Sequence, residues 1–366
     1  MHKNIAVLPG DGIGPEVIDQ ALKVMASISK RFGHTFTYTF ADVGAIAIDK
    51  TGNPLPEATK EICLAADAIL FGAIGDPKYD NDPNSKVRPE QGLLGLRKAM
   101  GLFANIRPVT TYPTLIHLSP LKEEKVAGVD LLILRELTGG IYFGEKGWDK
   151  EKGSAFDTCL YHVHEIERIS KLAFEYAKIR RNKVTLVDKA NVLESSRLWR
   201  DTVTKYAAKH YPEVELDFMF VDNAAMQLIQ YPKQFDVILT SNMFGDILSD
   251  EASVLPGSMG LLPSASIGLH TSMFEPIHGS FPQGTGKNIA NPMATILSAA
   301  MLLESLEMVE EAQVIRKAVM DVLEKGIGTP ELGPQIPLGC KEVGDILAAV
   351  VAEGADFSFD TYLLDF

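Results

Sequence analysis

The chain has little of what exported, membrane-spanning and nucleic-acid-binding proteins need. It contains only three cysteines in 366 residues, an odd and widely spaced set that indicates reduced thiols rather than a disulfide framework. Its apolar stretches, such as the one at 65–74, fall well short of the roughly 20 residues that span a bilayer. An apolar segment at 5–8 follows the first four residues directly, which leaves no room for a secretion signal. We therefore expect a cytoplasmic protein without a membrane span.

Basic residues are also scarce, since 35 Lys and Arg face 48 Asp and Glu. Nucleic-acid binding relies on clustered cations that displace counterions, so this balance argues against a nucleic-acid partner. A small anionic substrate stays possible where local arginines override the overall charge. The chain is longer than a single hydrophobic core usually supports, which favours two lobes.

What is present is an alternation of short apolar strands and helical segments. Residues 5–8 form an expected strand, and the following glycine-rich turn enters a helix with Pro15 in its first turn. Further strands are expected at 67–71, 131–134, 184–187 and 237–239, and helices at 292–303 and 310–325. This order predicts an α/β fold in which the outer parts of the chain could pair as one lobe around a middle insertion.

The turn after the first strand contains Gly10-x-Gly12-x-Gly14, which differs from the dinucleotide-binding fingerprint. That fingerprint has two residues between its second and third glycines and an acidic residue about 20 positions later. Here one residue separates the glycines, and the acidic candidate Asp42 lies further on. We expect a tight strand-to-helix turn against which a cofactor can lie, and not an ordinary Rossmann site.

Two groups of charged residues suggest a metal and a polycarboxylate substrate. Asp246 and Asp250 are four positions apart, so a helix would place both carboxylates on one face. Such a pair could bind Mg²⁺ or Mn²⁺, and the alternative is a solvated helix surface. Arg97, Arg107 and Arg135 could together bind carboxylates, although each alone fits an ordinary ion pair. Arg135 directly follows an apolar strand, where an unpaired charge would be costly.

Two further residues are candidates for acid-base chemistry. Tyr142 lies in a glycine-rich loop, and Lys189 follows the expected strand at 184–187. A lysine in a desolvated site beside other cations loses proton affinity. The alternatives are a packing role for Tyr142 and a salt bridge for Lys189. The spacing Cys159-x-x-His162-x-His164 resembles that of a zinc site, but we expect a structural role for these residues. In a strand, Cys159 would lie on the face opposite both histidines.

The motifs that hold these residues resemble the isocitrate/isopropylmalate dehydrogenase family of β-decarboxylating dehydrogenases. They are GDGIGPE, GLLGLRK, LFANIRP, LRELTGGIYFGE, VDKANVLE, TSNMFGDILSDEASVLPGSMGLLPSAS, FEPIHGS and GKNIANP. The resemblance implies a two-lobed fold with mixed sheets, one lobe at 1–102 plus 257–366 and the other at 103–256. It also implies a homodimer with shared active sites and no nucleic-acid or membrane partner.

The resemblance assigns roles to individual positions. It makes Tyr142 and Lys189 the acid-base pair, with the metal, Mg²⁺ or Mn²⁺, held by three aspartates: Asp222, Asp246 and Asp250. It implies substrate contacts for Arg97, Arg107, Arg135 and Asp222. It also implies that Glu90, Leu93 and Leu94 contact the side group of the substrate. The NAD site comprises Ile13, Glu90, Glu275, His278, Gly279, Ser280, Gln283 and Asn291. Lys189 would accept the hydroxyl proton through a relay, Asp222 would come from the partner subunit, and Tyr142 would protonate the enolate left by decarboxylation.

Within this family, the segment from Glu90 through GLLGLRK and the string LTGGIYFGE indicate the branch that oxidises 3-isopropylmalate with NAD in leucine biosynthesis. Leu93 and Leu94 suit an isopropyl group. The alternatives are a sister enzyme for isocitrate, homoisocitrate or tartrate, a silent regulatory subunit, and a carboxylate-binding protein without turnover. One position departs from the pattern, because NAD-using members typically have an aspartate where this chain has Gln283.

Overall fold

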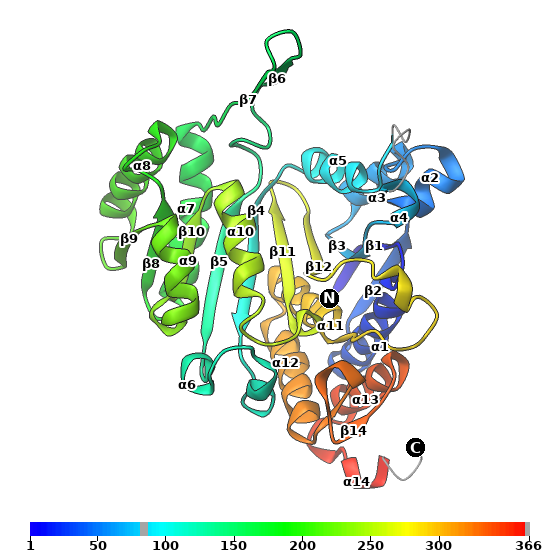
Figure 1. Cartoon of the computed structure of the whole chain (residues 1–366). Coiled ribbons are helices and arrows are strands. Elements are labelled where there is room, and N and C mark those ends of the chain that lie inside the picture. The colour runs from blue at the N-terminus through cyan, green and yellow to red at the C-terminus, as the bar shows by residue number, and fades with distance from the viewer. Residues whose placement is uncertain (81–86, 363–366) are drawn as a thin grey trace. The chain divides into compact units, whose positions relative to one another are not determined.

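The computed structural model describes residues 1–80 and 87–362 (Figure 1). The chain divides into two compact units. Unit 1 comprises Met1–Met100, Met259–Ala265 and His270–Phe366, and unit 2 comprises Gly101–Ser258 and Ser266–Leu269. Over the described residues, no helix is long and apolar enough to cross a membrane.

The strands of unit 1 follow the order β2-β1-β3-β12-β11. Strand β1 (His2–Gly10) pairs in parallel with β2 (Thr35–Phe40) and β3 (Ala68–Ala73), and β3 pairs in parallel with β12 (Ser272–Pro276). Residues 263–265 of β11 (Pro263–Gly268) complete this part. Every residue of β3 is buried, as expected for a strand covered on both faces.

The larger helices of unit 1 are α1 (Gly14–Phe32), α5 (Glu90–Met100), α11 (Met293–Ser305), α12 (Val309–Glu324) and α13 (Cys340–Glu353). Residues 293–303 of α11 are all buried, because this helix is apolar on every side. The smaller elements of unit 1 are α2 (Ala45–Thr51), α3 (Glu57–Ala65), α4 (Pro77–Asp80), α14 (Phe359–Tyr362), β13 (Ile327–Gly328) and β14 (Ile336–Pro337).

The turn between β1 and α1 is as tight as its glycines predict. Gly10 and Gly12 have φ angles of 70° and 61°, in the left-handed region that favours glycine. A Cβ atom on Gly12 would lie 2.0 Å from the carbonyl oxygen of Ser280, and the next amide, that of Ile13, donates to this oxygen over 2.8 Å. Glycine therefore lets the turn lie directly against the segment that carries Ser280.

Unit 2 contains a mixed set of strands in the order β4-β5-β10-β8-β9. Strand β4 (Leu102–Thr110) is antiparallel to β5 (Asp130–Glu136). Strand β10 (Val237–Thr240) lies parallel between β5 and β8 (Lys183–Asp188), and β8 is parallel to β9 (Glu215–Phe220). The carboxyl ends of these four parallel strands share one edge, which is where ligands bind in open α/β sheets.

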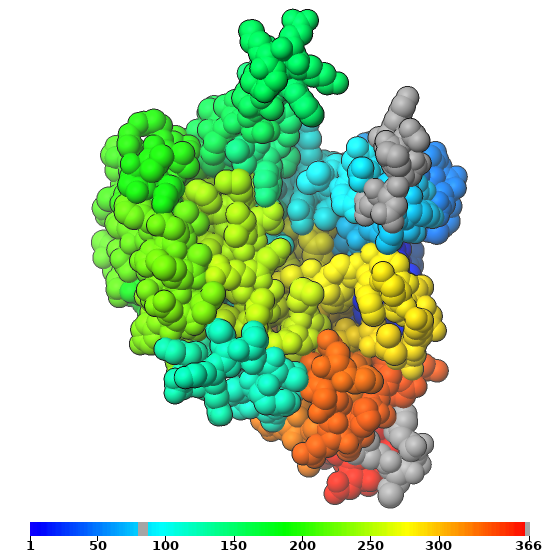
Figure 2. Space-filling view, in the orientation of Figure 1, coloured from blue at the N-terminus to red at the C-terminus, as the bar shows by residue number. Residues whose placement is uncertain are grey.

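The helices of unit 2 are α6 (Glu123–Val126), α7 (Val163–Lys178), α8 (Glu194–His210), α9 (Val221–Gln230) and α10 (Asn242–Ala252). One buried cluster joins side chains of β5 with those of α9 and α10, including Leu131, Ile133, Leu228 and Leu248. The hairpin of β6 (Lys146–Asp149) and β7 (Ser154–Asp157) extends away from the rest of unit 2 (Figures 1 and 2).

The α/β architecture with a mixed sheet, which the sequence predicts, is confirmed, and the expected strands and helices all form. The assumed strand through Cys159 and His164 is wrong. The segment at 158–162 is irregular, and α7 begins at Val163 with His162 as its N-cap. Glu165 closes a capping box with His162, and this local pairing starts a helix where alternation of side chains suggested a strand.

Candidate active site

Arg135 is at the centre of a charged cluster at the shared strand edge of unit 2. Its side chain emerges near the end of β5 and the residue is only 5% exposed. The Nε and Nη2 atoms donate to Asn242 Oδ1 over 3.1 and 2.9 Å, and Nη1 forms an ion pair with Asp246. The buried charge is therefore partnered, as the cost of burying it requires.

Arg107 on β4 forms a second ion pair in the same cluster. Its Nη1 atom donates to Asp250 Oδ1 and to Ser249 Oγ, each over 2.8 Å, and Nε donates to Asn105 Oδ1 over 2.9 Å. Asp246 and Asp250 lie one turn apart on α10, so the two arginines meet two carboxylates of one helix face. The sequence-based placement of both aspartates on one helix is confirmed.

Tyr142 joins this cluster through its hydroxyl group, which donates to Asp246 Oδ2 over 2.8 Å. The Arg135 guanidinium carbon lies 5.9 Å from the centroid of the tyrosine ring. Two effects raise the pKa of Tyr142 above its usual value: partial burial is the larger, and the hydrogen bond to Asp246 is the second. The phenol is therefore protonated at neutral pH and can act as a proton donor.

The loop that carries Tyr142 is held by Glu136, a fully buried carboxylate. Glu136 accepts hydrogen bonds from the amides of Thr138 and Gly139 over 2.9 and 2.8 Å, and it pairs with Arg168 at 3.4 Å. Burial raises the pKa of Glu136, while these donors and Arg168 act to lower it. Sequence analysis did not single out Glu136; its signal is a second charge after the apolar strand that ends at Arg135.

Asn242 connects the Tyr142 loop with the arginine cluster. Its Nδ2 donates to Gly139 O over 3.2 Å, while its Oδ1 receives the two hydrogen bonds of Arg135. The amide of Asn242 donates to the Tyr161 hydroxyl over 2.9 Å. Both Asn242 and Tyr161 are buried and were missed from the sequence. Asn242 opens α10 four residues before Asp246, which is the one local signal that could have suggested it.

Lys189 and Asp222 form a separate pair at the same edge of unit 2. Lys189 follows β8, Asp222 is the second residue of α9, and Lys189 Nζ donates to Asp222 Oδ1 over 2.5 Å. This hydrogen bond lowers the pKa of Asp222. Asp222 is well exposed, with a side chain 62% accessible. It can therefore contact molecules outside the chain.

The donors needed for a hard divalent cation are present, but one chain does not assemble a full ligand set. Asp246 and Asp250 offer carboxylate oxygens, which suit Mg²⁺ or Mn²⁺. Within residues 1–80 and 87–362, no three Asp, Glu, His or Cys side chains lie close enough together to hold a metal. Asp246 and Asp250 are instead neutralised by Arg135 and Arg107. A cation would fit here with a ligand added from substrate or another chain.

The remaining substrate candidates lie in unit 1, on α5. Arg97 Nη2 donates to Glu275 Oε1 over 3.2 Å, and both side chains are largely buried. The Nε atom of Arg97 is buried and has no partner among the described residues. On the same helix Leu94 is 49% exposed and Leu93 is half-buried. Arg97 therefore combines free donor capacity with neighbouring apolar side chains.

The nucleotide candidates of unit 1 gather around the turn that follows β1. Ser280 binds Ile13 through the backbone, and a Cβ atom on Gly75 would lie 3.2 Å from Glu90 Oε1 and 3.5 Å from Ser280 Oγ. Glu90, Ser280 and Ile13 are thus neighbours. Gly279 is exposed and open around its Cα atom, because an added Cβ would meet nothing within 4 Å.

Three further nucleotide candidates lie along the same segment of unit 1. His278 Nδ1 donates to Gly279 O over 3.0 Å, and burial lowers the pKa of His278, so the ring is neutral. Asn291 Nδ2 donates to Glu331 Oε1 over 2.9 Å. Gln283 lies in a 3₁₀ turn (Pro282–Gly284) and is exposed. Its amide is therefore accessible to a bound nucleotide.

Comparisons with known proteins match nearly the whole length of the chain. The profile of the isocitrate/isopropylmalate dehydrogenase family matches residues 4–347. The chain is 58% identical over 346 residues to the 3-isopropylmalate dehydrogenase of Bacteroides fragilis, covering 94% of this chain and 97% of that protein. It is 56% identical over 355 residues to the enzyme of the same name from Thermotoga maritima, covering 95% and 99%.

Solved structures show the same architecture. The isocitrate dehydrogenase of Methylococcus capsulatus superimposes with a TM-score of 0.84 at 34% identity, covering 96% of this chain and all of that one. A β-decarboxylating dehydrogenase from Thermococcus kodakarensis gives a TM-score of 0.80 at 35% identity, with 96% of each chain covered. The fold class expected from the sequence is therefore confirmed.

Proposed function

Because the chain belongs to the isocitrate/isopropylmalate dehydrogenase family, we propose that it oxidises and decarboxylates (2R,3S)-3-isopropylmalate to 4-methyl-2-oxopentanoate in leucine biosynthesis. The single observation that carries this proposal is the identity above 50%, over nearly the whole chain, to several 3-isopropylmalate dehydrogenases. NAD takes the hydride, and a divalent metal assists.

Substrate binding follows from the ion pairs of the cluster. Arg107 and Arg135 now face Asp250 and Asp246, and a substrate carboxylate can replace these partners in the same two-point geometry. Arg97 supplies a third guanidinium with unused donor capacity. Leu93 and Leu94, near Glu90 on α5, offer the apolar surface that an isopropyl group needs.

Substrate binding would free Asp246 and Asp250 to hold a cation, Mg²⁺ or Mn²⁺. Asp222 completes the ligand set from the partner subunit of a homodimer, which is consistent with its exposure and its position outside the cluster. When bound, the metal supplies Lewis-acid stabilisation of negative charge on the substrate oxygens. The exposed β6–β7 hairpin, with Trp148 at 74% accessibility, is a further candidate for subunit contact.

The proton steps use Lys189 and Tyr142. Lys189, which pairs with Asp222 and would reach the site from the same subunit as that aspartate, accepts the proton of the substrate hydroxyl, through a relay, as the hydride leaves the same carbon for NAD. Loss of carbon dioxide leaves the electron pair of the broken C–C bond as an enolate. Tyr142, whose raised pKa keeps its proton in place, donates that proton to the enolate carbon.

The NAD site combines residues of unit 1. Ile13 and Ser280, which are joined by a backbone hydrogen bond, would contact the nucleotide together with Glu90, the first residue of α5, and Glu275, which pairs with Arg97 of the same helix. His278, Gly279, Gln283 and Asn291 line the adenosine portion. A cytoplasmic location is part of this proposal.

A panel of assays tests the proposal. The purified protein is supplied with 3-isopropylmalate, isocitrate, homoisocitrate or tartrate, with NAD or NADP, and with or without Mg²⁺, while reduced nicotinamide is followed by absorbance. The proposal expects the highest kcat/KM with 3-isopropylmalate, NAD and Mg²⁺. Greater efficiency with isocitrate, the substrate named for one solved relative, would favour the sister enzyme instead.

A further inference from the structure

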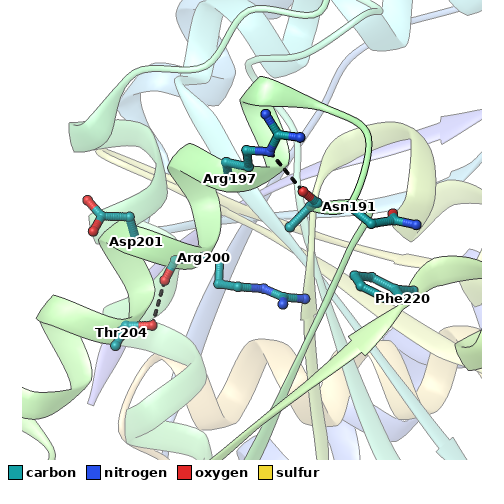
Figure 3. Close-up of a pocket in the computed structure, with 7 residues that line it drawn as sticks. Asn191, Arg197, Arg200, Asp201, Thr204 and Phe220 are labelled. Atoms are coloured by element: carbon teal, nitrogen blue, oxygen red, sulfur yellow. Dashed lines mark hydrogen bonds between the residues drawn. The ribbon is translucent and has the colours of Figure 1, made fainter.

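Arg200 lies in the wall of a cavity in unit 2, beside the segments that carry Lys189 and Asp222. The cavity has a volume of about 450 Å³ and is lined by Ala190, Asn191, Arg197, Arg200, Asp201, Thr204 and Phe220. Figure 3 shows the Arg200 side chain leaving its helix and extending toward Phe220. Sequence analysis assigned no role to Arg200, and the proposed chemistry does not use it.

The first set of contacts ties Arg200 to the turn that holds Lys189. Its Nε and Nη2 atoms donate to the two carboxylate oxygens of Asp188 over 2.9 and 2.8 Å. Asp188 ends β8 directly before Lys189 and is only 2% exposed. Its Oδ1 also accepts the amide of Ala190 over 2.9 Å. One carboxylate thus fixes the backbone on both sides of Lys189.

The second set of contacts ties Arg200 to the strand that precedes Asp222. The guanidinium carbon lies 5.0 Å from the ring centroid of Phe218 and 5.3 Å from that of Phe220. Phe220 ends β9 and is the N-cap of α9, two residues before Asp222. Asp188 and Phe220 are partners in the parallel register of β8 and β9. Arg200 therefore contacts both strand ends from which the Lys189–Asp222 pair emerges.

We propose that Arg200 is a positioning residue that sets the geometry of the Lys189–Asp222 pair by clamping Asp188 and packing on Phe220; this inference rests on the proposed function for its effect on turnover. An arginine suits the task because its planar fork binds a carboxylate at two points while its face stacks on an aromatic ring. A lysine offers one point charge and cannot make both contacts at once.

The first measurement compares Arg200→Gln and Arg200→Lys with the wild type in steady-state kinetics. Misplacing a reacting group by about 1 Å can cost on the order of 100-fold in rate. We expect kcat to fall about 10- to 100-fold in Arg200→Gln while KM for 3-isopropylmalate changes less than about 3-fold, since the substrate arginines are elsewhere. Arg200→Lys keeps the charge and should still lose most of kcat. Full recovery with lysine would overturn the positioning role.

A double-mutant cycle tests whether Arg200 acts through Asp188. If it does, Asp188→Asn combined with Arg200→Gln should lower kcat about as much as the more damaging single change. If the fold-losses in kcat of the two single variants instead multiply in the double variant, Arg200 does not act through Asp188. Arg316→Gln is the matched control, because Arg316 pairs with Glu304 in the same two-point geometry over 3.0 and 2.9 Å and joins α12 to α11. Its kcat should equal that of the wild type.

Hydrogen–deuterium exchange provides a readout that does not depend on turnover. We expect the amides at 189–193 and 221–223 to exchange about 10-fold faster in Arg200→Gln than in the wild type and in Arg316→Gln. Unchanged exchange in these segments would overturn the inference whatever the kinetics show. A wild type that does not turn over 3-isopropylmalate would instead refute the proposed function, while the exchange result would still decide whether Arg200 holds this pair.

Discussion

The hydroxyl of Tyr142 donates to Asp246 Oδ2 over 2.8 Å, and the other oxygen of this carboxylate pairs with Arg135. One aspartate thus contacts both the proposed acid and a proposed substrate arginine. A change of its partners when substrate binds would release the Tyr142 hydroxyl toward the reacting carbon. Under the proposed function, we expect substrate and metal to replace these ion pairs.

Replacing Tyr142 with phenylalanine should abolish most turnover without weakening substrate binding. The substitution removes the proton donor and keeps the ring beside Arg135. Loss of one positioned acid typically lowers kcat by about 10² to 10⁴. Steady-state kinetics with 3-isopropylmalate and NAD would measure this, with KM expected to stay within a few-fold. An unchanged kcat would remove Tyr142 from the proposed mechanism.

Turnover should require a divalent cation. Asp246, Asp250 and Asp222 form ion pairs with Arg135, Arg107 and Lys189, and substrate carboxylates would compete with the aspartates for the two arginines. Dialysis against a chelator should therefore remove activity, and Mg²⁺ or Mn²⁺ should restore it. Circular dichroism before and after dialysis serves as the folding control. Full activity after exhaustive chelation would contradict the metal assignment.

Asn242→Ala should raise KM and lower kcat together. The change removes the acceptor of two Arg135 hydrogen bonds and the donor to Gly139 O in the Tyr142 loop. Leaving a buried polar group unsatisfied costs about 1–3 kcal/mol, which should also appear in the free energy of unfolding. Denaturant titration and steady-state kinetics measure the two effects. A loss of stability with unchanged kinetic constants would mean that Asn242 only supports the fold.

The preference for 3-isopropylmalate over isocitrate should depend on Leu93 and Leu94. A third carboxylate placed against these side chains would lose hydration without gaining a partner, while an isopropyl group would bury apolar surface. Leu94→Arg should therefore lower kcat/KM for 3-isopropylmalate and raise it for isocitrate. Leu64→Arg, a change at another exposed leucine of unit 1, provides the control and should alter neither value. A substrate ratio that stays constant in Leu94→Arg would show that this helix does not read the side group.

Much of the fold follows from local sequence patterns, whereas the connections within the site do not. The glycines before α1, the apolar strands and the four-residue spacing of Asp246 and Asp250 each depend on nearby residues, and these predictions are confirmed. Asn242 and Tyr161 gain their roles from contacts across 81 positions, which no periodicity encodes. Only tertiary packing brings them under the Tyr142 loop.

Gln283 should make the enzyme prefer NAD over NADP by a narrower margin than an aspartate would. An aspartate at this exposed position could accept hydrogen bonds from both adenosine ribose hydroxyls and repel a 2′-phosphate, following the logic of the acidic residue in dinucleotide folds. Glutamine keeps hydrogen-bonding capacity and lacks the repulsion, while Lys287 is the one cation that the segment at 283–287 supplies for a phosphate. Gln283→Asp should therefore lower kcat/KM with NADP by a further factor equivalent to about 1–3 kcal/mol.

Steady-state kinetics with both cofactors, for the wild type and for Gln283→Asp, measure this change. Gln283→Glu tests whether a negative charge on a longer side chain has the same effect. A wild-type preference for NADP would refute the cofactor assignment, and a cofactor ratio unchanged by Gln283→Asp would show that residue 283 does not face the ribose.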